Sequence, residues 1–153
     1  MSREIEVSRS IAARPQIVWQ IITDIAGADI TLSGVDSVEI LTPGEYLPGF
    51  RWLETRKMFG VSSTQEMMVQ ESAPPETTTV YSMSSGTEYY TTFTLAPEGA
   101  GTLLSLHFSS RIKHAGMAAS LMDTLFGSIA LRQTEKMLNR DLADIANAAE
   151  KLS

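Results

Sequence analysis

The sequence predicts an α+β fold, in which a curved antiparallel sheet of seven strands wraps around one long C-terminal helix. Three observations predict this fold. Apolar and polar residues alternate in separate segments, as expected for strands with one buried face. Short turns rich in Gly, Pro and Ser separate the later segments, and such connections favour an antiparallel meander. The last part of the chain changes to helical periodicity, with an apolar stripe that must lie against the sheet.

The first part of the chain holds one strand and two helical segments before a second strand. Apolar and polar residues alternate from Glu4 to Ile11, which predicts a strand with one buried face. Pro15 then opens a helix, because proline fits the first helical turn, and Gly27 ends it. Residues 28–34 are expected to form a second short helix or helical turn, and alternation returns over residues 35–40.

Strands and turns follow until the chain becomes helical. The further strands expected are 50–58, 63–71, 77–83, 88–95 and 102–112. The final helix follows Gly116, and its apolar stripe holds Leu131, Leu138, Leu142, Ile145, Ala149 and Leu152. Apolar residues of the segment 117–129 surround most of the helix, so either Gly127 breaks the helix or the segment is buried on two sides. A lid and a dimer surface are further interpretations of this segment.

Composition limits the classes of function. The 153 residues suit one domain spanning residues 1–153, and a net charge of −6 argues against nucleic-acid binding. The absence of Cys excludes thiol nucleophiles, iron–sulfur clusters and cysteine zinc sites, and only 2 His are present. We therefore expect no metal and no cofactor. We also expect no signal peptide and no membrane span, which predicts a cytoplasmic protein without stable membrane insertion.

Several segments resemble one superfamily in their order and in the positions of their turns. They are IEVSRSIAARPQIVW from residue 5, GFRWLETRKMFG from residue 49, TQEMMVQESAPP from residue 64, GTEYYTTFTLAP from residue 86 and GTLLSLHF from residue 101. The chain resembles the START-like, Bet v 1-like superfamily (SRPBCC), and specifically its bacterial polyketide cyclase/dehydrase and lipid-transport branch. The resemblance covers nearly the whole chain. It implies a helix-grip fold with an internal cavity between the sheet and the C-terminal helix.

The resemblance implies three functions, and the residues leave the choice between binder and enzyme open. The first is binding of a small hydrophobic ligand, such as a lipid or a polyketide-like molecule, in the internal cavity. The second is an enzyme of the cyclase or dehydratase type, which uses acid–base residues without a metal or a covalent nucleophile. The third is a protein-interaction module similar to chaperone-activator or quinone-binding relatives. A homodimer is also compatible with the sequence.

The strand 50–58 carries the main polar candidates. One of its faces holds Trp52, Glu54, Arg56 and Met58. If this face lines the cavity, Glu54 and Arg56 pair with each other and orient a ligand oxygen. If it faces solvent, they form an ordinary surface ion pair. Glu66 on the next strand is a weaker candidate, because Met67 and Val69 are expected to point inward there.

Tyr89 is the third polar candidate. Its hydroxyl either hydrogen-bonds a ligand carbonyl, acts as a general acid, or bonds a backbone carbonyl as a structural group. The candidate catalytic residues are thus Glu54, Arg56 and Tyr89. His107 is expected to face solvent, and His114 lies in the turn before the final helix. The residues expected to bind a ligand are Trp52, Glu54, Arg56, Met58, Met67, Val69, Met83, Tyr89, Phe93, Leu106, Phe108, Leu121, Met122 and Leu125.

Overall fold

The computed structural model has the element order that the sequence predicts. It describes residues 2–58, 60–112 and 117–153, without the side chains of Ser2, Met58 and residues 117–130. The elements are β1 (Ser2–Ile11), α1 (Pro15–Thr23), the 3-10 helix η1 (Ile25–Gly27), α2 (Ala28–Thr31), β2 (Val35–Ile40), β3 (Arg51–Met58), β4 (Val61–Ala73), β5 (Thr77–Ser84), β6 (Thr87–Glu98), β7 (Gly101–Ile112) and α3 (Met117–Leu152). The predicted helix-grip arrangement is confirmed.

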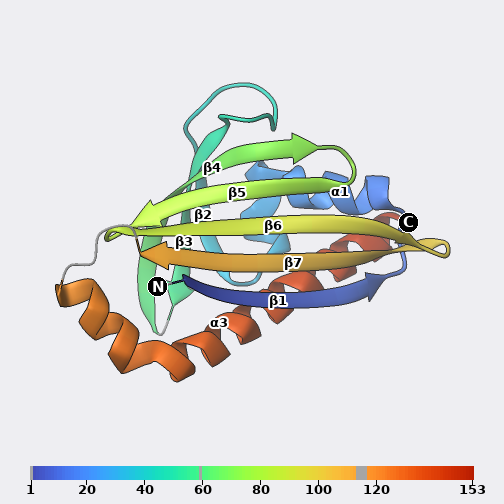
Figure 1. Ribbon diagram of the computed structural model, residues 1–153. Coiled ribbons are helices and arrows are strands. Elements are labelled where there is room, and N and C mark those ends of the chain that lie inside the picture. The colour runs from blue at the N-terminus through green and yellow to red at the C-terminus, as the bar shows by residue number, and fades with distance from the viewer. Residues whose placement is uncertain (1, 59, 113–116) are drawn as a thin grey trace.

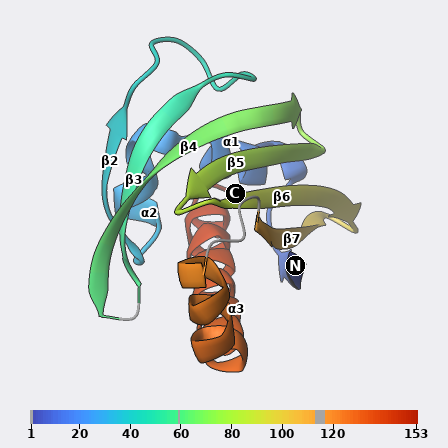
Figure 2. The same ribbon diagram turned by 60° about the vertical axis from the view of Figure 1, so that its left-hand side comes forward.

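The seven strands form one antiparallel sheet in the order β1-β7-β6-β5-β4-β3-β2. The strands from β2 to β7 follow one another as a meander, and β1 joins the sheet beside the last of them. Figures 1 and 2 show the sheet curving around α3, which lies along its concave side. Because each strand alternates its side chains between two faces, the concave face receives every second residue of each strand.

The predicted helix over residues 15–27 is divided in two. The helix α1 ends at Thr23, and the Asp24 carboxylate then accepts a hydrogen bond from the Gly27 backbone N–H at 3.3 Å. This bond caps η1, because a short polar side chain satisfies a free N–H at the start of a helical turn. The other helix, α3, continues through Gly127, so the alternative in which Gly127 breaks the helix is wrong. The predicted burial, lid or interface role of residues 117–129 lies outside the described side chains.

A filled hydrophobic core occupies the end of the sheet where α1 meets the C-terminal half of α3 (Figure 1). Val18, Leu104 and Leu142 are fully buried there. The predicted stripe of α3 is confirmed for Leu138, Leu142, Ile145 and Ala149, which are all buried. Leu152 was expected in the same stripe, but it is 57% exposed, because the helix ends there beyond the edge of the core.

Acidic side chains of α3 connect the helix to both edges of the sheet. Near β1, the Glu150 carboxylate accepts a hydrogen bond from the Ala12 backbone N–H at 2.9 Å. Near β2, Asp144 accepts hydrogen bonds from the backbone N–H and the hydroxyl of Ser33, at 2.9 and 2.8 Å. The helix therefore spans the open side of the curved sheet.

Candidate functional site

A cavity of about 880 Å³ lies between the concave face of the sheet, the α1–α2 segment and α3. This volume falls within the range of sites that enclose small organic molecules. Most of the wall is apolar. The apolar residues on it include Ile5, Ile21, Ile22, Ile25, Leu32, Trp52, Met67, Val80, Phe93, Leu106, Phe108, Leu131, Met137, Leu138 and Ile145.

Strand alternation positions the polar groups on this wall. On β6, Tyr89, Thr91 and Phe93 point into the cavity, and on β7 Ser110 does so. Their sequence neighbours point outward, as shown by Tyr90, whose hydroxyl donates to the Glu88 carboxylate at 3.0 Å. The concave faces therefore combine apolar side chains with a small number of hydroxyl groups.

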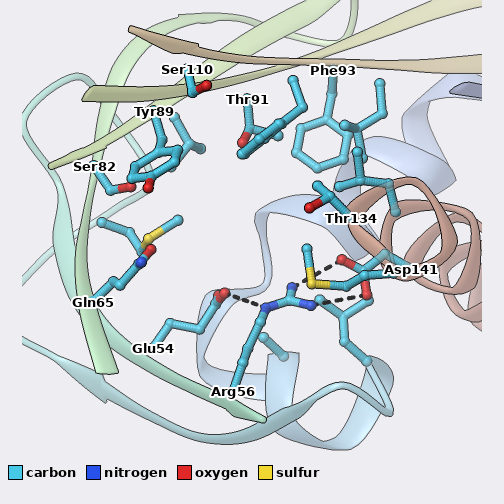
Figure 3. A pocket seen from close by; sticks show the side chains of 18 of the residues that line it. Glu54, Arg56, Gln65, Ser82, Tyr89, Thr91, Phe93, Ser110, Thr134 and Asp141 are labelled. Carbon is cyan, nitrogen blue, oxygen red and sulfur yellow. Dashed lines mark hydrogen bonds and ion pairs between the residues drawn. The ribbon is translucent and has the colours of Figure 1, made fainter. Parts of the chain in front are cut away.

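One charged cluster lies on the wall where β3 faces α3 (Figure 3). The Arg56 Nε donates to Glu54 Oε2 at 2.8 Å. Its two terminal nitrogens contact the two carboxylate oxygens of Asp141, at 3.2 and 3.0 Å. The Trp52 indole N–H donates to the other oxygen of Glu54 at 3.4 Å. We refer to Glu54, Arg56 and Asp141 as the acidic triad, because two carboxylates surround one guanidinium.

Burial and neighbouring charges shift the pKa values of Arg56 and Asp141 in opposite directions. The side chains of Glu54, Arg56 and Asp141 are only 13%, 14% and 8% exposed. Burial acts to lower the pKa of the Arg56 guanidinium, but the attraction of Asp141 and Glu54 outweighs it and raises that pKa. Burial also raises the pKa of Asp141, against the opposing effect of Arg56. Arg56 therefore stays charged, and the Asp141 carboxyl holds a proton more readily than usual.

A group of uncharged polar side chains from β4 to β7 continues the cavity wall from the acidic triad, beginning at Gln65, the cross-strand neighbour of Glu54 (Figure 3). We call Gln65, Ser82, Tyr89, Thr91 and Ser110 the hydroxyl–amide wall. The Tyr89 ring stacks on Phe108, with ring centroids 5.9 Å apart and an angle of 26° between planes. Burial raises the pKa of Tyr89 above its usual value near 10.0, so its hydroxyl is a neutral donor at physiological pH.

An aromatic group closes the cavity beside Trp52. The Tyr46 ring meets those of Trp19, Phe50 and Trp52, with centroids 6.2 to 6.5 Å apart. The Tyr46 hydroxyl lies 2.8 Å from the Thr78 hydroxyl, which itself donates to the backbone carbonyl of Glu71 at 2.8 Å. Since Thr78 has only one hydroxyl proton, Tyr46 must be the donor in their bond. This bond fixes the ring at the cavity wall.

Most of the predicted ligand-binding residues with described side chains lie on the cavity wall. They are Trp52, Glu54, Arg56, Met67, Tyr89, Phe93, Leu106 and Phe108. The two alternatives for strand 50–58 are thereby decided, because its Trp52–Arg56 face is the concave one. That these residues bind a ligand stays a prediction. The side chains of Met58, Leu121, Met122 and Leu125, and all of His114, lie outside the described residues.

Two of the predicted wall residues lie elsewhere. Met83 is 54% exposed on the outer face, because its neighbours Ser82 and Ser84 take the inward positions of β5. Val69 is fully buried within the apolar cluster around Phe50 and does not reach the wall. Placing either residue in the cavity was therefore wrong.

Glu66, the weaker candidate for the polar cluster, and His107, which was expected to face solvent, both lie on the outer face of the sheet. Glu66 forms an ion pair with Arg51 at 3.2 Å on the outer face, and both side chains are about half exposed. His107 lies 3.9 Å from the exposed Glu4 carboxylate, also on the outer face. Among residues 2–58, 60–112 and 117–153, no group of three or more His, Asp or Glu residues could hold a metal ion. Within the same part of the chain, no helix is both long and apolar enough to cross a membrane.

Sequence reasoning missed Asp141 and Tyr46. Asp141 had a detectable signal, because it lies three residues after Leu138 and four before Ile145, inside the apolar stripe of the helix. An acidic residue in a buried stripe calls for a buried partner, which Arg56 provides. Tyr46 had no such signal, since it lies in an irregular segment between two Pro-Gly pairs that looked like a surface loop.

Comparisons with known proteins agree with this architecture. No curated protein matches the chain. Similar solved structures include the protein TTHA0849 from Thermus thermophilus, at 18% identity and a TM-score of 0.82, with 99% of each chain covered. The ZhuI aromatase/cyclase from a Streptomyces species is 16% identical with a TM-score of 0.80, and the match covers 99% of this chain and 95% of that one. A START superfamily protein from Mycobacterium smegmatis is 15% identical with a TM-score of 0.78, over 98% of this chain and 99% of that one.

These structural similarities show a shared fold, and a family model adds a match at the level of sequence. The model describes the family as polyketide cyclase / dehydrase and lipid transport, and it matches residues 2–150. The resemblance noted in the sequence is thereby confirmed. Because the match spans almost the whole chain, the protein belongs to the polyketide cyclase / dehydrase and lipid transport family.

Proposed function

We propose that this protein binds a small, mainly apolar molecule in the cavity between the sheet and α3. The observation that carries the proposal is the cavity itself, which measures about 880 Å³ and has an apolar wall with polar groups at two places. Such walls release water on binding, while a few polar groups fix the orientation of the ligand. The family description, which includes lipid transport, supports the same function.

Blocking the cavity tests this proposal. Ser110→Trp places a large ring into the cavity from β7, whereas Ser109→Trp adds the same ring to the adjacent, outward position. We expect Ser110→Trp to weaken binding of apolar molecules by at least about tenfold, because the ring occupies their space. Ser109→Trp should leave binding unchanged.

The measurement uses molecules that the protein extracts from a cell lysate. Native mass spectrometry of the wild type and both variants identifies bound molecules, and displacement of the neutral probe N-phenyl-1-naphthylamine gives relative affinities. Circular dichroism confirms that both variants fold. Equal binding by both variants, or no bound molecule and no probe binding in the wild type, would contradict the proposed function.

A second candidate function is a cyclase or dehydratase reaction in the same cavity. The observation that favours it is the presence of a neutral phenol, Tyr89, across the cavity from a charged guanidinium, Arg56 (Figure 3). A phenol can donate its proton to a ligand carbonyl as that carbonyl becomes negatively charged. One similar structure is an aromatase/cyclase, which supports this candidate. The interaction-module function is not proposed, because it expects a filled cavity.

Tyr89→Phe tests the enzymatic candidate. The change removes only the hydroxyl, so the ring still stacks on Phe108 and the fold is retained. If Tyr89 is the general acid, turnover of a linear poly-β-ketone should fall by at least about 100-fold, with little change in its affinity. Product formation is followed by chromatography, and Tyr90→Phe on the outer face serves as the control. Equal rates in both variants would remove Tyr89 from this role.

A further inference from the structure

The charges on the cavity wall do not balance. Among the described residues, the charged side chains that line the cavity are Arg3, Asp24, Glu54, Arg56 and Asp141. These are two cations and three carboxylates, which gives the wall a net charge of −1 when all are ionised. The imbalance lies within the buried acidic triad, where Glu54 and Asp141 share Arg56.

Arg56 is already occupied by anions. Three of its five N–H groups contact carboxylate oxygens, at 2.8 Å for Glu54 and at 3.2 and 3.0 Å for Asp141. The contact with Asp141 uses both terminal nitrogens, which is the geometry by which a guanidinium would otherwise recognise a ligand carboxylate. A bound acid would thus be a third anion around one cation, in a site where little water screens the repulsion.

A second arginine lies behind the triad without contributing to the wall. A Cβ atom at Gly34 would lie 2.7 Å from a terminal nitrogen of Arg140 and 3.2 Å from one of Arg56, so both guanidinium groups border this glycine. Arg140 is exposed to solvent and is not among the lining residues. Because Arg140 lies outside the wall, the side chains that a bound ligand can touch keep an excess of one negative charge.

The remaining polar groups of the wall suit neutral ligands. The hydroxyl–amide wall offers hydroxyl groups from Ser82, Tyr89, Thr91 and Ser110 and one amide from Gln65, none of them charged. Hydroxyl and amide groups can donate to a carbonyl and accept from a hydroxyl. A neutral oxygen-bearing ligand therefore finds partners there without meeting the charge repulsion of the triad.

We infer that the cavity selects neutral molecules bearing carbonyl or hydroxyl groups over molecules bearing a carboxylate, and that Asp141 sets this selectivity by occupying Arg56. The inference rests on the proposed function, because it concerns the ligand of the same cavity. Such a cavity would bind neutral lipids and ketones more tightly than fatty acids, although the two groups are similar in size and differ mainly in charge.

Two matched pairs of probes test this charge selectivity at pH 8. N-phenyl-1-naphthylamine and 8-anilinonaphthalene-1-sulfonate share a ring system, and only the second is an anion. Decanol and decanoate share a chain length, and their affinities follow from displacement of the neutral fluorescent probe. We expect each neutral member to bind at least about tenfold more tightly than its anionic partner. Binding that persists in Ser110→Trp is subtracted, because it lies outside the cavity.

Three variants test whether the acidic triad causes this preference for neutral ligands. Asp141→Asn removes one charge with almost no change in shape, so decanoate should bind about tenfold more tightly while decanol is little affected. Glu54→Gln should act in the same direction, which covers the case in which Asp141→Asn does not fold. Glu66→Gln is the control, because it makes the same charge change on the outer face.

The outcomes separate this inference from the proposed function. If no neutral probe binds in the cavity, the proposed function is wrong and the inference falls with it. If neutral probes bind but the anionic members bind equally well or better, only the inference is overturned. If the selectivity is present but unchanged in both Asp141→Asn and Glu54→Gln, the triad does not cause it and the assignment to Asp141 is wrong.

Discussion

Arg56→Met is expected to lower the free energy of unfolding by about 3–5 kcal/mol. The guanidinium is the partner of both Glu54 and Asp141, whose side chains are only 13% and 8% exposed. Methionine has a similar length and is apolar, so the variant leaves two buried carboxylates without a cation. The unfolded chain solvates both carboxylates freely, and the equilibrium shifts toward it.

Urea unfolding followed by circular dichroism measures this effect against a matched control. Arg51→Met makes the same substitution on the same strand, where Arg51 pairs with Glu66 on the solvent-exposed face. Its cost should stay within about 1 kcal/mol, because exposed ion pairs contribute little. The combined variant Arg56→Met, Glu54→Gln, Asp141→Asn should recover much of the loss, since no buried charge then lacks a partner. Equal stability of Arg56→Met and Arg51→Met would contradict the burial argument.

Leu142→Ala is expected to cost about 2–5 kcal/mol of stability. Leu142 is 1% exposed in the filled core between α1, β7 and α3, so its removal leaves a cavity as well as losing apolar contacts. Leu152→Ala makes the same change on the same helix at a side chain that is 57% exposed. This control should change stability by no more than about 0.5 kcal/mol. Similar unfolding midpoints for the two variants would contradict the placement of the core.

Periodicity in the sequence predicted the architecture because each element carries its own pattern. The apolar faces of the strands and the stripe of α3 depend only on local spacing, and apart from Met83 on β5 and Leu152 on α3 they were found where expected. The ends of the strands were predicted less accurately. The strand expected over residues 63–71 extends to Val61–Ala73, because its pairing continues past the point where the alternation becomes irregular.

The candidate site was only partly predictable, since it depends on partners far apart in the sequence. Glu54 and Arg56 could be paired from their spacing on β3, but Asp141 is 85 residues away from Arg56 along the chain. No local pattern joins such positions. The prediction for Met83 was wrong for a different reason. Its apolar side chain was expected to point inward, but the register of β5 gives the inward positions to Ser82 and Ser84.

The sheet does not close into a barrel, and this affects how the cavity can respond to its contents. The strands β1 and β2 form the two opposite edges of the sheet, and α3 spans the opening between them (Figure 2). Glu150 binds the backbone near one edge, whereas Asp141 and Asp144 bind groups near the other. In a closed barrel, a wider interior would require the breaking of a continuous ladder of backbone hydrogen bonds. Here the width of the interior depends instead on how α3 packs across the opening, so it can change without breaking the backbone hydrogen bonds between the strands.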